Sequence, residues 1–274
     1  MTATILHVSD LHFGDPEATL NRVEVINVFG SLLARTGPDV LVVLSGDITF
    51  QGQKKGYSEA LDALQPALKK VGISGKRVVM CPGNHDIVKS AGGPSFEAFD
   101  AWSAGVRNDK LCTFNDNSCR RVSHPEADFL VINSAYHGDS KYGLVDLAQL
   151  DVILAEMGSA LNEDPPRVAV VHHHLIPFSG AADNSTTRNA YQVITRLVKH
   201  GFSLILHGHQ HALLQLGVGG GFMKLCGVGS FRYLTRGFIN GASVYRIEEG
   251  NKMSTEHYAI SKDAPDFLRR FTDF

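Results

Sequence analysis

Five short polar stretches of the sequence each follow a run of apolar residues, at positions 9–12, 45–47, 83–86, 172–174 and 207–211. Together they supply Asp10, Asp47, Asn84 and several histidines, but no cysteine. Carboxylate and amide oxygens combined with imidazole nitrogens, without thiolates, form a ligand set that suits Mn²⁺, Fe or Zn²⁺. These side chains are numerous enough to hold two ions if one carboxylate bridges them.

The spacing within the stretches agrees with this chemistry. One residue separates Asp10 from His12, and one residue separates His209 from His211. Because alternate residues of an extended segment point the same way, each pair can face one ion. Glycines at 46, 83 and 208 allow the backbone to turn sharply between strand and ligand.

The apolar runs before these stretches have the composition of short strands buried on both faces. Such runs lie at 5–8, 40–44, 78–80, 129–132, 168–171 and 204–206. Between them, apolar residues follow helical spacing at 25–32, 61–68, 147–157 and 187–199. This alternation predicts an α/β fold, in which the carboxyl ends of parallel strands share one edge and place their ligands there. The polar stretches are therefore expected to meet in space.

Two other parts of the chain follow a different pattern. After residue 211, close-set strands such as 243–247 and 255–260 are joined through Gly250-Asn251, which predicts an antiparallel pair that completes a second sheet. The segment 89–124 holds a short helix at 96–102 and a polar loop, and we expect it to be an insertion over the site. With no repeat or linker, residues 1–274 are predicted to form a single domain.

Composition excludes several functional classes. Of the 274 residues, 43% are hydrophobic and 20% are charged, as in ordinary globular proteins. A formal net charge of -2 offers no clear nucleic-acid surface. Residues 1–8 lack the basic start and long apolar stretch typical of a signal peptide. The sequence has no CxxC pair, and no apolar run approaches the roughly 20 residues that cross a membrane. We expect a cytoplasmic protein without a membrane partner, and a homo-oligomer is compatible with the sequence.

The ordered set of polar stretches resembles the signature of the calcineurin-like metallophosphoesterases. That signature reads D-x-H, GD, GNH(D/E), a histidine after an apolar strand, and GHxH; this chain has DLH, GD, GNHD, VVHHH and GHQH in the same order. The resemblance implies a four-layer αββα sandwich of two facing mixed β-sheets flanked by helices. The length and the GNHD and HxH spacing resemble the class III cyclic nucleotide phosphodiesterases in particular.

The resemblance also implies a role for each polar residue. The first metal would be held by Asp10, His12, Asp47 and His211, and the second by Asp47, Asn84, His172 and His209. His85 would be the catalytic acid and Asp86 its orienting partner. The triple histidine departs from the family's usual pattern; His172 directly follows the strand and is the expected ligand, with His173 as the alternative.

These residues together imply a two-metal phosphoesterase. A metal-bridging hydroxide would attack a phosphodiester, such as a cyclic nucleotide, while His85 protonates the leaving oxygen. The alternative is a phosphomonoesterase or nucleotide pyrophosphatase acting on a small phosphorylated metabolite. A nuclease or an inactive scaffold is less favoured, because the chain has no added DNA-binding region and lacks none of the expected ligands. The expected cofactors are two divalent or trivalent ions per chain, Mn, Fe or Zn.

Two arginines near the polar stretches could also reach a phosphate. Arg188 lies at the start of a predicted helix, and Arg232 follows Gly229-Ser230-Phe231. For each of them we favour a solvated surface role.

Overall fold

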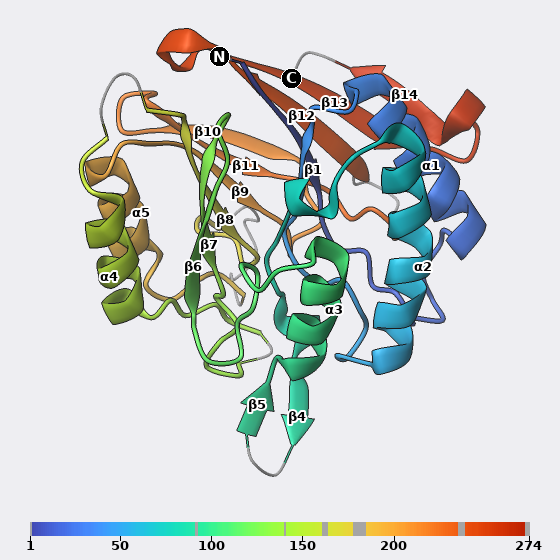
Figure 1. Cartoon of the computed structure of the whole chain (residues 1–274), viewed down its shortest axis with the longest axis horizontal. Helices are drawn as coiled ribbons and strands as arrows, with labels where there is room; N and C mark the ends of the chain where they lie inside the picture. Colours follow the sequence, from blue (N-terminus) through green and yellow to red (C-terminus); the bar gives the residue numbers. More distant parts are fainter. Residues whose placement is uncertain are drawn as a thin grey trace.

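The structure is a computed structural model that describes residues 2–90, 93–139, 141–160, 164–177, 185–234 and 239–271. Among these residues, the strands form two six-stranded mixed sheets that face each other, and a short hairpin stands apart from them. Helices cover the outer face of each sheet, so the layers run helix, sheet, sheet, helix (Figure 1). The four-layer αββα sandwich implied by the family resemblance is the observed architecture.

The first sheet combines the N-terminal strands with the C-terminal ones, in the order β14-β13-β12-β1-β2-β3. Its strands are β1 (Ala3–Val8), β2 (Leu41–Leu44), β3 (Val78–Met80), β12 (Gly241–Ile247), β13 (Met253–Ile260) and β14 (Leu268–Phe271). β1, β2 and β3 are parallel, whereas β12 runs antiparallel to β1 and to β13. The expected antiparallel pair is therefore present, but it extends the first sheet and does not complete the second.

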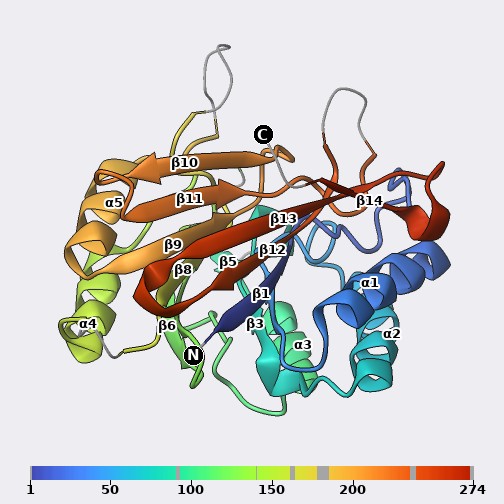
Figure 2. The same cartoon turned by 90° about the horizontal axis from the view of Figure 1, so that it is seen from above.

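The second sheet has the order β10-β11-β9-β8-β7-β6, and Figure 2 shows its strands from above. Its strands are β6 (Cys119–Ser123), β7 (Asp128–Ile132), β8 (Arg167–Val171), β9 (Phe202–His207), β10 (Leu214–Val218) and β11 (Met223–Gly227). β7, β8, β9 and β11 are parallel to one another, and antiparallel strands form both edges.

Five α-helices of the described residues flank the sheets (Figure 1). Helices α1 (Arg22–Thr36), α2 (Lys54–Val71) and α3 (Glu97–Arg107) lie beside the first sheet, and α4 (Leu147–Met157) and α5 (Ala190–Lys199) beside the second. Asn21 begins α1 with a capping box, in which its side chain accepts from the Glu24 N–H and Glu24 accepts in return. Asp146 caps the start of α4 without a capping box, its side chain accepting from the backbone N–H groups of Ala148 and Gln149.

Shorter elements complete the chain. Single turns of 3₁₀ helix lie at Gly75–Arg77, Asn84–Asp86, Glu249–Asn251 and Pro265–Phe267, and the separate hairpin consists of β4 (Val88–Ser90) and β5 (Gly93–Ser95). The segment 89–124 contains parts of that hairpin, α3 and β6. The helix expected at 96–102 is longer than its apolar pattern suggested, because it continues to Arg107.

The central strands of the second sheet, β7, β8 and β9, are buried on both faces, as their apolar composition predicted. In β7, Leu130 packs toward the core of α4 and α5, whereas the neighbouring Val131 packs into the core that includes the first sheet. β9 alternates in the same way, with Ile205 on the helix side and Leu206 between the sheets. This double burial fixes the register of the strands that carry the polar stretches. None of the helices in the described ranges is long and apolar enough to cross a membrane.

Candidate metal centre

The five polar stretches meet where β1, β2, β3, β8 and β9 end. These strands belong to two sheets, so the site lies where two sheet edges adjoin and not along a single edge. Backbone hydrogen bonds join the stretches directly: Asp10 N donates to Gly46 O at 3.1 Å, and Gly208 N donates to His172 O at 3.1 Å. The stretches are therefore held by one another as well as by their own strands.

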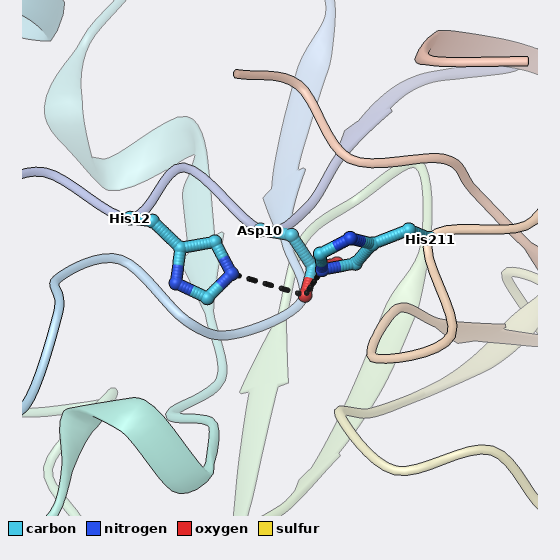
Figure 3. A group of neighbouring side chains, drawn as sticks. All are labelled: Asp10, His12 and His211. Atoms are coloured by element: carbon cyan, nitrogen blue, oxygen red, sulfur yellow. Dashed lines mark ion pairs between the residues drawn. The ribbon is translucent and has the colours of Figure 1, made fainter. Parts of the chain in front are cut away.

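A first group of ligands surrounds the buried carboxylate of Asp10 (Figure 3). His211 Nε2 lies 3.2 Å from Asp10 Oδ1, and His12 Nε2 lies 3.8 Å from the same oxygen. The two rings come from segments far apart in the sequence and face the carboxylate between them (Figure 3). Three ligand atoms thus converge on one point.

A second group lies beside the first and consists of Asp47, His172 and His209. His172 Nε2 is 3.2 Å from Asp47 Oδ2, 3.2 Å from His209 Nδ1 and 3.1 Å from Asn84 Oδ1. The other nitrogen of His172, Nδ1, lies 2.8 Å from the Ser45 carbonyl oxygen. Because a carbonyl only accepts, Nδ1 carries the proton in the neutral ring and Nε2 keeps a lone pair for an ion.

The Asp47 carboxylate faces both groups. Its Oδ2 lies 3.2 Å from His172 Nε2 in the second group and 3.8 Å from His12 Nε2 in the first. This is the position from which a carboxylate can bridge two ions, the role that the family resemblance implied for Asp47.

Five of the expected ligands have a backbone conformation that residues with a side chain rarely adopt. Their φ angles are positive, at 56° for Asp10, 44° for His12, 52° for Asp47, 71° for His209 and 52° for His211. Such a conformation costs about 1–3 kcal/mol at each residue and persists only where the surroundings enforce it. The strands end abruptly here because the backbone reverses to aim ligands into a common space. No sequence pattern marks this feature.

Two of the motif glycines act in different ways. Gly46 has a φ of 108°, so it provides the sharp turn that was expected of it. Gly83 has an ordinary extended conformation, and a Cβ atom there would collide with the Asp47 carboxylate. Gly83 is therefore required for close approach, which lets the Asp47 and Asn84 stretches share one site.

The polar atoms of the site fit a bound cation. Asp10 Oδ1 and His12 Nε2 are both buried, and neither makes a hydrogen bond. No lysine or arginine of the described residues pairs with Asp10 or Asp47. Oxygen and nitrogen ligands that approach one another without hydrogen-bonding are the arrangement expected of groups that share a metal ion.

The pKa values of the second group show how strongly it attracts positive charge. Burial raises the pKa of Asp47, but the imidazoles of His172 and His12 outweigh burial and hold it well below its usual range. Burial lowers the pKa of His172, yet the adjacent Asp47 carboxylate outweighs burial and raises that pKa to about 9. A cation, either a proton or a metal ion, is thus favoured between these side chains.

His85 lies half-buried beside both groups. Its ring stacks on Phe50, with centroids 5.6 Å apart and planes at 27°, and meets the edge of His12 at 4.9 Å. Its backbone is fixed from both sides, because its N–H donates to Asp47 Oδ1 at 2.8 Å and its carbonyl accepts from Gly52 N at 2.6 Å. The ring is also close enough to His12 and Asp47 for the three to form a further ligand group.

Asp86, the expected orienting partner of His85, directs its carboxylate elsewhere. Its buried carboxylate accepts hydrogen bonds from the backbone N–H groups of Ile48, Thr49 and Gly83 and from the hydroxyls of Thr49 and Tyr57. Among the described residues, the structure gives no hydrogen bond between Asp86 and the His85 imidazole. The family resemblance implied a pairing, but the carboxylate turns inward and joins the Asp47 loop to the Gly83 turn.

The remaining histidines near the site lie outside the two ligand groups. His173 Nδ1 pairs with Ser134 Oγ at 2.8 Å, and burial lowers the pKa of His173 well below its usual range. His207 Nδ1 lies 3.2 Å from the Gly208 carbonyl oxygen, and burial lowers its pKa to about 4. Of the histidines at 172 and 173, it is His172 that the structure brings to Asp47.

The two arginines differ from each other. Arg188 is largely exposed and pairs with Asp139 at 3.1 Å, a surface role. Arg232 is only 6% exposed, so the expectation of a solvated side chain is wrong for this residue. Its partners are backbone carbonyls of residues distant in the sequence, and no local pattern could have identified them.

A pocket of about 540 Å³ opens beside His85. It is lined by Gln51, Asn84, His85, Ile87, Val88 and Lys89. Because Asn84 and His85 form part of its wall, a molecule in this pocket reaches the edge of the second ligand group. Its volume is in the range typical of small-molecule sites.

Comparison with known proteins gives matches over most of the chain. The family model of the calcineurin-like phosphoesterases matches residues 3–213. A protein from Pseudoalteromonas sp. (strain SM9913), described as a probable cyclic nucleotide phosphodiesterase, is 25% identical over 215 residues, which is 76% of this chain and 70% of that protein.

Solved structures share the fold. A dimetal phosphatase from Danio rerio aligns with a TM-score of 0.65 and 14% identity, over 93% of this chain and 95% of that chain. GAP50, described as the anchor in the inner membrane complex of Plasmodium, aligns with a TM-score of 0.55 and 12% identity, over 99% and 88% of the two chains. At these identities the likeness concerns architecture alone. The motif order, the clustered ligands and the family model together show that the chain belongs to the calcineurin-like phosphoesterases, a family of metal-dependent phosphoester hydrolases.

Proposed function

We propose that this protein is a two-metal phosphodiesterase with a small phosphoester substrate, of which a cyclic nucleotide is the leading candidate. The observation that carries the proposal is the position of Asp47, whose carboxylate faces ligand groups on both sides. The preference for a diester is supported by the bacterial relative that is described as a probable cyclic nucleotide phosphodiesterase.

The two ligand groups support an assignment of residues to each ion. Asp10, His12, Asp47 and His211 would hold the first metal, and Asp47, Asn84, His172 and His209 the second. Mn²⁺, Fe and Zn²⁺ all suit this set of oxygen and nitrogen donors. When bound, such ions supply an activated water at neutral pH and draw charge from the phosphoryl oxygens.

His85 is the proposed general acid. Its half-buried ring stands between the ligand groups and the pocket, where a leaving alkoxide would emerge. Proton donation at that oxygen contributes about 10²–10⁴-fold in rate. Phe50 holds the plane of the ring, so that a substrate in the pocket meets the nitrogens at a fixed angle.

The pocket would receive the leaving group. Ile87 and Val88 give it an apolar wall, while Gln51 and Lys89 place an amide and an ammonium group at its edge. A nucleoside has this combination of an apolar face and polar edges. This match favours a nucleotide as substrate.

The test is hydrolysis of bis(p-nitrophenyl) phosphate and p-nitrophenyl phosphate by EDTA-treated protein to which Mn²⁺ is restored. A higher kcat/KM for the diester, dependent on Mn²⁺, is the expected result. A preference for the monoester would replace the proposal with a phosphomonoesterase. Failure to cleave either ester or a panel of cyclic nucleotides, with both metals bound, would identify a scaffold.

A further inference from the structure

A segment beyond the residues matched by the family model contacts the first ligand group. The match ends at residue 213, whereas residues 230–233 lie against the loop that carries Asp10 and His12. An isolated parallel bridge pairs Ser9 with Ser230. We call residues 230–233 the clasp.

The clasp binds the carbonyls of four consecutive residues, 9 to 12. Phe231 N donates to Ser9 O at 3.0 Å, and Ser230 Oγ donates to Asp10 O at 2.9 Å. Arg232 Nη1 then donates to Leu11 O at 3.3 Å and to His12 O at 3.0 Å. Every backbone acceptor of the first ligand loop is therefore held by this one segment.

Arg232 provides half of these contacts and is built into the fold. Its Nε and Nη2 both donate to Leu20 O, at 3.1 and 2.9 Å, and its guanidinium lies 4.7 Å from the centre of the Phe13 ring. No carboxylate of the described residues pairs with it, so all of its hydrogen bonds go to carbonyl oxygens. A guanidinium has five donors in a rigid fork, and an ammonium group cannot reproduce that geometry.

The loop needs such external support. Asp10 and His12 both have left-handed φ angles, which an isolated strand end would not keep. Relaxation of either residue would rotate its side chain away from His211. Because buried carbonyls must find donors, the bonds from Arg232 stabilise the strained conformation over the relaxed one.

Tyr233 contacts the side chains of two ligands of the first group. Its ring stacks on His211, with centroids 5.9 Å apart and planes at 18°, and meets the edge of His12 at 5.1 Å. Its hydroxyl donates to the Asp15 carboxylate, which anchors the ring. The imidazoles of His12 and His211 therefore both pack against the anchored ring of Tyr233.

We propose that Arg232 is a positioning residue for the first metal site, acting through the carbonyls of Leu11 and His12. The inference rests on the proposed role of Asp10, His12 and His211 as ligands of that metal. Among the described residues, the clasp forms no hydrogen bond and no ring contact with His172 or His209, so the inference predicts an asymmetry between the two ions. Loss of Arg232 should weaken one ion and spare the other.

A matched control exists in the same chain. Arg167, at the opposite end of the second sheet, is 4% exposed and also donates to three backbone carbonyls, those of Met157, Gly158 and His200. Arg167→Gln should therefore lower stability for the same physical reason as Arg232→Gln, but without any effect on the metals.

The experiment measures Mn²⁺ binding by equilibrium dialysis across a range of free Mn²⁺, for wild type, Arg232→Gln, Arg232→Lys and Arg167→Gln. Both Arg232 variants should retain one tight ion and bind the other about 10–100-fold more weakly, the usual effect of altering the support of a ligand. Ser230→Ala, which removes the bond to Asp10 O and the bond from Tyr233 N but leaves both bonds of Arg232 to the loop, should show a smaller change in the same ion. It serves if the Arg232 variants do not fold.

Equal weakening of both ions, or an equal effect in Arg167→Gln, would overturn the inference. So would unchanged binding in a folded Arg232 variant, or in Ser230→Ala if neither Arg232 variant folds. Because dialysis requires no substrate, the result is independent of the reaction. If wild type binds two ions yet cleaves no phosphoester, the proposed function fails while the role of Arg232 is still tested.

Discussion

The Asp47 carboxylate accepts a hydrogen bond at 2.8 Å from the backbone N–H of His85. One oxygen of the proposed bridging ligand, Oδ1, thus fixes the backbone of the proposed acid, while the other oxygen, Oδ2, faces His12 and His172. The position of the acid is therefore set by the same group that would join the two metals. Changes at Asp47 and His85 should have different consequences for metal content, and this difference separates their roles.

His85→Ala tests the general acid. We expect metal content to remain near that of wild type while kcat falls about 10²–10⁴-fold on an alkyl phosphodiester. The loss should be smaller on an aryl diester, because a nitrophenolate leaves without needing a proton. The measurement is the ratio of wild-type to variant rates on the two substrates. Equal losses would mean that His85 mainly holds the phosphate, and loss of metal would make it a ligand.

Asp86→Asn tests the inward role of this carboxylate. An asparagine would turn an NH₂ group toward backbone N–H donors, and a buried unsatisfied polar group costs about 1–3 kcal/mol. We expect the free energy of unfolding to fall by this amount and metal binding to weaken, because Asp86 holds the Asp47 loop. The pH dependence of kcat should keep its shape. If the pH profile of kcat shifted while the free energy of unfolding stayed at the wild-type value, Asp86 would instead be the orienting partner of the His85 ring.

Single substitutions can show which residue of the triple histidine is the metal ligand. His172→Ala should strongly weaken one of the two metals, because its Nε2 lies beside both Asp47 and Asn84. His173→Ala should have a milder effect, since the His173 ring pairs with Ser134. Metal analysis after Mn²⁺ loading compares them, and the reverse order would move the ligand one residue along the chain.

Stability should depend on pH through the buried His7 ring. Burial, aided by the nearby His207, lowers the pKa of His7 from 6.5 to about 3. Between these values the unfolded chain binds a proton that the folded protein excludes, so stability falls as pH falls. The lowered pKa of His7 should reduce the free energy of unfolding by about 2 kcal/mol between pH 7 and pH 5. Urea unfolding in EDTA should show a smaller loss over this range for His7→Gln than for wild type.

The exposed His137 supplies the control for that measurement. His137→Gln should lose as much stability between pH 7 and pH 5 as wild type does. If His7→Gln also matched wild type, the ring would not be excluded from protonation in the folded protein.

The strands of the site could be predicted because each obeys a simple rule. A short apolar run such as 40–44 must be buried on both faces, and the polar residues that follow it have nothing to gain from burial. The position of Asp47 at a strand end follows from that pattern alone. The meeting of these five strand ends was also predictable, although the apolar pattern placed them along one sheet edge and did not show that they belong to two different sheets.

The residues that hold the ligand loops in place could not be predicted, because their hydrogen bonds are made to backbone groups. Arg232 binds carbonyls about 210 to 220 positions earlier in the chain, and Asp86 binds backbone N–H groups of residues 48 and 49. Any residue provides such partners, so no side-chain pattern marks them. The left-handed φ of Asp10 likewise depends on contacts made after folding.

The central claim is that Asp47 belongs to two metal ions, and its most direct test is metal analysis of Asp47→Ala beside Asp10→Ala. Both substitutions remove a buried carboxylate, but Asp10 lies in only one ligand group. At a free Mn²⁺ concentration that loads wild type with two ions per chain, we predict that Asp10→Ala keeps one ion and that folded Asp47→Ala keeps neither. If Asp47→Ala retained as many ions as Asp10→Ala, the carboxylate would not be a bridge, and the two-metal account would be contradicted.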